Sequence, residues 1–221
     1  MTSGQHIPVY FLSNTESLSI VKNYEPPQYP DHPKEIKGAT GGFLNNYFIT
    51  CGGNDSVVGF SEYCHKLGVS PGYFAIMTTE RFLAASVVLE SEKLWILGGK
   101  NKENYLLSST EYIFIDGRTE YGPYMPTELY GHAMAKINET AFILAGGYGY
   151  DGYSKGTWYY NGDWIDGPDL QKGRRGHSVG IVRDPFTTYV VVAGGYDGTY
   201  LNDVEILDVK QNKWWETGKL L

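Results

Sequence analysis

The sequence lacks the features of several protein classes. No apolar run approaches the length of about 18 residues needed to cross a membrane, and residues 1–5 have neither the basic nor the apolar stretch of a secretory signal peptide. Basic residues number 18 against 25 acidic ones, for a net charge of −7. Because nucleic acid requires a basic surface, we expect neither a nucleic-acid nor a membrane partner. We expect a cytoplasmic location, or an extracellular one if an upstream signal is missing from this sequence.

Cysteine is scarce, and the two cysteines, Cys51 and Cys64, cannot make a framework of several disulfides. We expect them on adjacent strands of one sheet, as free buried thiols in a reducing compartment. A disulfide across the two strands is the alternative. Two glycosylation sequons, which begin at Asn54 and Asn138, matter only if the protein is exported.

Glycine and tyrosine are abundant instead, with 28 and 19 residues respectively. Glycine supplies turns and bulges, and tyrosine suits short, half-buried strands and wet binding surfaces. Apolar residues make up 42% of the chain, which is enough for a substantial core. Helical periodicity is absent, so the pattern predicts an all-β protein.

Pairs of glycines recur at a nearly constant stride, each directly after an apolar run. The intervals between successive pairs are 46, 48 and 48 residues, which indicates a repeat architecture. The four pairs are Gly52-Gly53, Gly98-Gly99, Gly146-Gly147 and Gly194-Gly195. Each period divides into four short strands. In the last period these are His177–Val182, Tyr189–Ala193, Val204–Asp208 and Lys213–Glu216.

The second strand of each period is apolar on both faces, as expected for a strand enclosed between neighbouring sheets. The glycine pair would end that strand where backbones crowd together and a Cβ would clash. Aromatic residues late in each period are expected to pack between the sheets. They are Tyr73, Tyr121, Trp164, and Trp214 or Trp215.

The fourth period resembles the kelch repeat, through Arg174, Gly176-His177, Gly194-Gly195-Tyr196-Asp197-Gly198, Leu201-Asn202-Asp203-Val204-Glu205 and Trp214. The third period keeps Gly131-His132 and Trp164, and the first two diverge more. The resemblance covers residues 38–221 and implies an all-β, kelch-type β-propeller with four full four-stranded blades. The implied repeats are about 38–79, 80–126, 127–170 and 171–221.

Residues 1–37 are expected to hold the outer strands of an earlier half blade and a crossing segment. The predicted strands are Ile7–Leu12 and Ser17–Lys22, and the crossing is the proline-rich segment Tyr24–Pro33. Propellers close by completing one blade with strands from both termini, and no strands follow Leu221 to do so. We therefore expect an incomplete ring, whose unpaired edges could associate with another copy.

No catalytic arrangement stands out in the sequence. His132 and His177 occupy equivalent repeat positions, which indicates a shared structural role rather than metal ligation. The segment Gly147–Gly152 lacks the Lys-Ser/Thr of a phosphate-binding loop. We therefore predict a protein that is not an enzyme and needs no cofactor or metal. A propeller oxidase or a sugar-binding propeller stays as an alternative, although neither cysteine falls in the central loops that oxidase chemistry would need.

The loops after the glycine pairs should all open onto one face, because the strands repeat in register. Tyrosine and arginine anchor protein interfaces well, so we predict that this face binds another protein, whose identity the sequence does not give. The predicted contact residues are Tyr105, Tyr124, Tyr148, Tyr150, Tyr153, Lys155, Arg174, Tyr196 and Tyr200, near Lys100 and Lys102. For Arg174, a structural role beneath the face is the alternative.

A second function is also compatible with the resemblance. Many kelch proteins recognise substrates for ubiquitin ligases and carry a BTB domain before the propeller. No BTB-like helical segment precedes residue 38. The alternative function is therefore the substrate-recognition part of such an adaptor, without its BTB domain.

Overall fold

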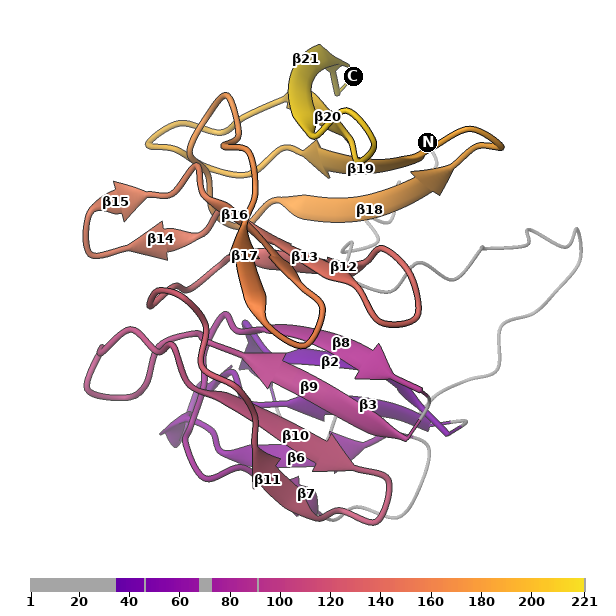
Figure 1. The fold of residues 1–221 in the computed structure, drawn as a ribbon. Helices are drawn as coiled ribbons and strands as arrows, with labels where there is room; N and C mark the ends of the chain where they lie inside the picture. Colours follow the sequence, from indigo (N-terminus) through magenta and orange to yellow (C-terminus); the bar gives the residue numbers. More distant parts are fainter. Residues whose placement is uncertain (1–34, 46, 68–72, 91, 221) are drawn as a thin grey trace, which may run out of the picture.

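The structure is a computed structural model that describes residues 35–45, 47–67, 73–90 and 92–220. Four sheets of four antiparallel strands each follow one another along the chain (Figure 1). Over these residues there is no helix that could cross a lipid bilayer. The fold is therefore all-β, with four kelch-type propeller blades, and the four sheets do not close into a ring.

The strands of each blade pair in the order in which they occur along the chain. Blade 1 holds β2 (Thr40–Leu44), β3 (Tyr47–Cys51), β6 (Tyr63–Lys66) and β7 (Tyr73–Ile76), and blade 2 holds β8 (Ala85–Leu89), β9 (Lys93–Leu97), β10 (Thr110–Phe114) and β11 (Thr119–Tyr121). Blade 3 holds β12 (Ala133–Lys136), β13 (Phe142–Ala145), β16 (Thr157–Tyr160) and β17 (Trp164–Asp166), and blade 4 holds β18 (Ser178–Arg183), β19 (Thr188–Ala193), β20 (Asp203–Asp208) and β21 (Lys213–Lys219).

Short strands form in the loops that follow two of the glycine pairs. After the first pair, β4 (Asn54–Asp55) and β5 (Gly59–Phe60) join β1 (Ile36–Lys37) in a small three-stranded sheet. After the third pair, β14 (Tyr148–Gly149) and β15 (Gly152–Tyr153) form a hairpin. The predicted N-terminal strands Ile7–Leu12 and Ser17–Lys22, and the crossing Tyr24–Pro33, lie outside the described residues.

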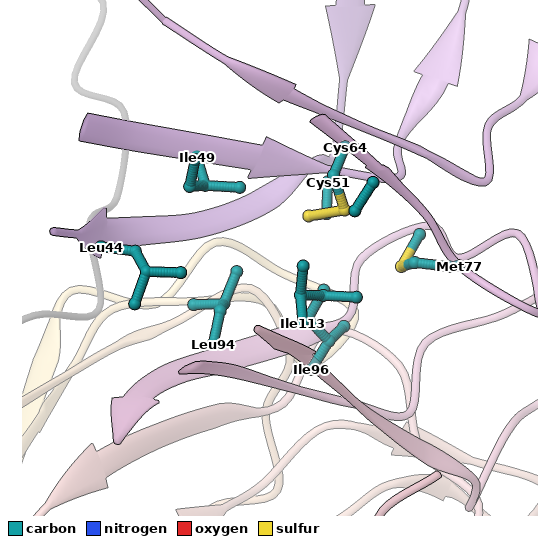
Figure 2. Packing of buried hydrophobic residues seen from close by; sticks show 9 residues of the cluster. Leu44, Ile49, Cys51, Cys64, Met77, Leu94, Ile96 and Ile113 are labelled. Atoms are coloured by element: carbon teal, nitrogen blue, oxygen red, sulfur yellow. A yellow bond between two sulfur atoms is a disulfide. The ribbon is translucent and has the colours of Figure 1, made fainter. Parts of the chain in front are cut away.

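The core lies between neighbouring blades, and the second strands supply it on both sides. In β9, Leu94 and Ile96 pack against blade 1, whereas the intervening Trp95 and the following Leu97 pack against blade 3. Successive residues of a strand point to opposite faces, so a strand enclosed between two sheets must be apolar throughout. This confirms the sequence-based interpretation for the second strands of blades 2 and 3, each of which contributes to two clusters, and Figure 2 shows the cluster between blades 1 and 2.

Two of the predicted inter-blade aromatics do pack in these cores. Trp214 is buried between blades 3 and 4, and Trp164 lies 5.9 Å from Trp95, measured between ring centroids. The prediction was wrong for Tyr73 and Tyr121, which are 56% and 68% exposed. The large ring between blades 2 and 3 comes instead from Trp95 on a second strand, where the sequence pattern indicated only an apolar residue.

Cys51 and Cys64 lie on adjacent strands, as predicted, but the expectation of free thiols was wrong because they form a disulfide. The two residues are direct cross-strand partners of β3 and β6, with their Cα atoms 4.0 Å apart. Close cross-strand pairs of this kind bring the side chains together. Both cysteines are buried in the core between blades 1 and 2 (Figure 2).

Candidate functional site

One end of the blades is built from two kinds of loop. The loops after the glycine pairs (residues 54–62, 100–109, 148–156 and 196–202) meet the segments that cross from one blade to the next (77–84, 122–132 and 167–177). We call this end the loop face. The β14–β15 hairpin projects from it, on the left in Figure 1.

The glycine pairs direct the chain onto this face. Gly146 and Gly147 have φ angles of 61° and 107°, a region that favours glycine because it lacks a Cβ. The Gly147 amide donates a 2.7 Å hydrogen bond to the Arg174 carbonyl in the crossing to blade 4. A Cβ on Gly147 would lie 2.9 Å from the Cβ of His132. The pair therefore bends the chain where loop and crossing backbones touch.

An identical backbone contact recurs in blades 2, 3 and 4. In each, the residue after the glycine pair exchanges two backbone hydrogen bonds with a residue of the crossing that leads into that blade. The pairs are Phe82 with Lys100, Tyr130 with Tyr148, and Arg175 with Tyr196. We call these six residues the inner rim. Their neighbours Leu83, Gly131 and Gly176 line a central hollow of about 1370 Å³.

Two cations of the inner rim lie among aromatic rings. The Lys100 ammonium is 5.5 Å from the Phe82 ring and 5.4 Å from the Tyr130 ring. The Arg175 guanidinium is 5.3 Å from Tyr130, 5.9 Å from Tyr148 and 5.6 Å from Tyr196. Cations within about 6 Å of a ring centroid are attracted by the electron-rich face. The ring of Tyr130 is therefore near both a cation of blade 2 and a cation of the crossing into blade 4.

Tyrosine rings form a continuous run across blades 3 and 4. Neighbouring ring centroids are 5.5 Å apart for Tyr130 and Tyr148, 4.9 Å for Tyr148 and Tyr153, 5.9 Å for Tyr153 and Tyr196, and 5.3 Å for Tyr196 and Tyr200. Edge-on and tilted contacts at these distances are favourable. The structure thus brings four predicted contact residues into one surface with Tyr130.

The other predicted contact residues lie outside this run of tyrosines. The Tyr150 hydroxyl accepts a 3.3 Å hydrogen bond from the Leu106 amide, which connects the hairpin of blade 3 with the loop of blade 2. Tyr105, Tyr124, Tyr150 and Lys155 are exposed. Lys102 is 3.6 Å from the Glu80 carboxylate.

The prediction that Arg174 contacts a partner was wrong, because its side chain is fully buried. Its guanidinium pairs with Asp203 and Glu205 and donates to the Gly194 carbonyl. This is the structural role that the sequence left as an alternative. The side chain of the neighbouring Arg175 lies at the loop face instead. Phe82, Tyr130 and Arg175 were missed, although they share one repeat position and an alignment of the four periods would have paired them.

The two repeat-equivalent histidines are buried beside the central hollow. Burial lowers the pKa of His132 to about 4, and the Leu97 backbone opposes this shift. Burial, together with the nearby Arg174 charge, lowers the pKa of His177 to about 3. Both imidazoles are neutral at neutral pH. Across the described ranges, no three His, Cys, Asp or Glu side chains are grouped to hold a metal ion.

Comparisons with known proteins agree on the fold. The family model described as "Kelch motif" matches residues 186–214. Among the solved structures that match is one titled "Structure of YjhT", with a TM-score of 0.71 and 14% sequence identity, over 84% of this chain and 71% of that chain. A comparison with curated proteins gives no match. At this level of identity the structural likeness shows the architecture, and function must be argued from the site.

Proposed function

We propose that this chain, whose residues 186–214 match the kelch motif and whose blades have the propeller fold, binds a segment of another protein on its loop face and performs no catalysis of its own. The observation that carries this proposal is the run of five touching tyrosines from Tyr130 to Tyr200. Tyrosine is enriched among residues that dominate binding energy, because it buries a large area and keeps a polar end.

The scaffold supports this role because the tyrosines are held in place before a partner arrives. Tyr130, Tyr148 and Tyr196 each donate and accept backbone hydrogen bonds within the inner rim. Tyr153 pairs with Tyr148 across the β14–β15 hairpin. A side chain that is already positioned loses less conformational entropy when it binds.

Peptide selection tests the proposal and does not require the partner to be identified first. A displayed library of random peptides is selected on the immobilised full chain, and the affinities of enriched peptides are measured by calorimetry. We expect the combined changes Tyr148→Ala, Tyr150→Ala and Tyr153→Ala to weaken binding by at least about tenfold. A matched control changes Tyr47, Tyr73 and Tyr189 to alanine, at the ends of their strands away from the loop face, and should bind like the unaltered chain. Equal affinities for all three proteins would refute the proposal.

The cytoplasmic location stays a prediction. Disulfides persist in oxidising compartments and are rare in the cytosol, so the bond between Cys51 and Cys64 supports the extracellular alternative. Blocking free thiols in intact source cells before lysis, followed by mass spectrometry, would decide between them. Alkylated Cys51 and Cys64 would indicate a reducing location, and an intact disulfide an oxidising one.

A further inference from the structure

The chain has five arginines, and Arg175 differs from the other four. Arg81, Arg118 and Arg174 each pair with a carboxylate, and Arg183 donates to the Ile137 carbonyl. Arg175 has no ion pair with any described residue, and its Nε atom is buried without a hydrogen-bond partner. An N–H donor withdrawn from water and left unpaired is costly, so this position is poised for an acceptor from outside the chain.

The surrounding rings leave the donors of Arg175 free. The ring centroids of Tyr130, Tyr148 and Tyr196 lie 5.3–5.9 Å from its guanidinium carbon, and none of these residues accepts a side-chain hydrogen bond from it among the described residues. An arginine beside aromatic faces still directs its N–H groups outward in its own plane, where they match the two oxygens of a carboxylate. The tyrosines therefore hold the cation in place without using the hydrogen bonds that a ligand would accept.

Lys100 provides a second cation, 5.4 Å from the centroid of the same Tyr130 ring. Its Nζ donates to the Asn104 side-chain oxygen at 3.2 Å, and it forms no ion pair within the described part of the chain. An ammonium has three donors, so two are left for another acceptor. Both cations stand out because the chain as a whole carries a net charge of −7.

We infer that the inner rim binds a carboxylate side chain of the partner, paired with Arg175 beside the ring of Tyr130, and that Lys100 adds a second positive charge nearby. The inference rests on the proposed function and adds the chemical group of the partner that the loop face recognises. Exposed carboxylates of Glu128 and Asp151 lie on the same loops and would repel a run of acidic residues. The site therefore suits a single Asp or Glu with uncharged, partly aromatic neighbours that pack on the tyrosines.

The same peptide selection also tests this inference. We expect enriched peptides to share one acidic position. For a synthetic peptide, changing that residue to its amide should weaken binding to the unaltered chain by at least about 30-fold, because the guanidinium would lose the negative charge and one of the two oxygens that it pairs with. On an Arg175→Met chain the acid and amide peptides should bind equally. The control Arg118→Met removes a surface arginine far from the rim and should preserve the difference between them.

The possible failures are distinct. Peptides that need the tyrosines but show no acidic position, or that lose nothing on Arg175→Met, would overturn the carboxylate site and leave the proposed function standing. A phosphoserine peptide that binds more tightly than its glutamate form would also overturn the assignment to carboxylate. Loss of the tyrosine dependence would instead refute the proposed function. Circular dichroism checks folding, and Arg175→Gln and Lys100→Met provide the test if Arg175→Met does not fold.

Discussion

Arg81 and Glu111 form an ion pair with an N–O distance of 2.9 Å, and both side chains are fully buried. Two periods later, Arg174 and Glu205 form the equivalent pair. In both cases the arginine also donates to the carbonyl of the first glycine of its blade's pair, Gly98 or Gly194. The ion pair thus ties the crossing segment to the strand end beneath the loop face.

Breaking the first of these pairs should destabilise the protein strongly. We expect Glu111→Gln to lower the free energy of unfolding by about 3–5 kcal/mol, because it leaves a buried guanidinium without its counter-charge. Urea denaturation measures the change. On the surface, Arg118→Ala removes an exposed pair with Asp116 and Glu120 and should leave the free energy of unfolding nearly unchanged.

Blade 3 offers a natural replacement for the ion pair. Leu129 and Trp158 occupy the positions of Arg81 and Glu111 there, and both pack in the apolar cluster between blades 2 and 3. The double change Arg81→Leu with Glu111→Trp should therefore cost less than Glu111→Gln alone, since no unpaired charge is buried. A double variant less stable than the single one would show that the site of blade 2 does not tolerate apolar replacement.

The disulfide should contribute to stability through the loop that it closes. Cys51 and Cys64 are 13 residues apart, and a loop of this size corresponds to about 3 kcal/mol of free energy of unfolding. We expect the urea midpoint of the unaltered chain to fall when a reductant is added. The Cys51→Ala, Cys64→Ala double variant should have the lower midpoint with or without reductant. An identical midpoint for the reduced and oxidised chain would contradict the prediction.

The buried histidines predict a dependence of stability on acid. Their pKa values in the folded protein, about 4 for His132 and about 3 for His177, lie below the ordinary value of 6.5. Below about pH 6.5 the unfolded chain takes up protons that the folded chain does not. The free energy of unfolding should therefore fall as the pH decreases from about 6.5 towards 4, by up to about 1.4 kcal/mol per pH unit for each histidine.

Denaturation midpoints measured at several pH values check this slope. His177→Asn should flatten it relative to the unaltered chain, whatever its effect on absolute stability. Above pH 6.5 the two proteins should have parallel profiles, because the histidines are neutral in both states. An unchanged slope in the variant would assign the acid sensitivity to other groups.

The glycine pairs should be sensitive to substitution. Gly147→Ala would force a side chain into a φ of 107° and against His132, and we expect a loss of about 1–3 kcal/mol or more. Gly180 in β18 provides a matched control, because nothing lies within 4 Å of a Cβ added there. Its change to alanine should be nearly neutral. Equal losses at both sites, measured by thermal unfolding, would disprove the role of backbone geometry.

The blades could be predicted from the sequence because each signal was local and repeated. A glycine pair after an apolar run indicates both a strand and the residue at which it ends, and four such pairs gave the length of the repeat. The residues of the contact surface were harder to predict from the sequence, as Arg174 and Arg175 illustrate. Two adjacent arginines look alike in a sequence, yet one points into the protein and the other to the surface. Only the direction of the crossing segment decides which is which.

The disulfide and the inter-blade rings escaped prediction for a related reason. Adjacent strands were expected for Cys51 and Cys64, but whether the thiols pair depends on their being directly opposite each other. The tryptophans of blades 3 and 4 occupy the position that Thr119, not Tyr121, holds in blade 2, and there Trp95 from a different strand supplies the large ring.

Tyr130 belongs to blade 3, whereas its two cationic neighbours, Lys100 and Arg175, belong to blades 2 and 4. The spacing of the two charges is therefore set by the angles between three blades rather than by any single loop. A ligand that bridges them would resist tilting of one blade against the next. Conversely, a smaller side chain at Trp95, deep between blades 2 and 3, would loosen that angle and weaken binding at a surface that it never touches.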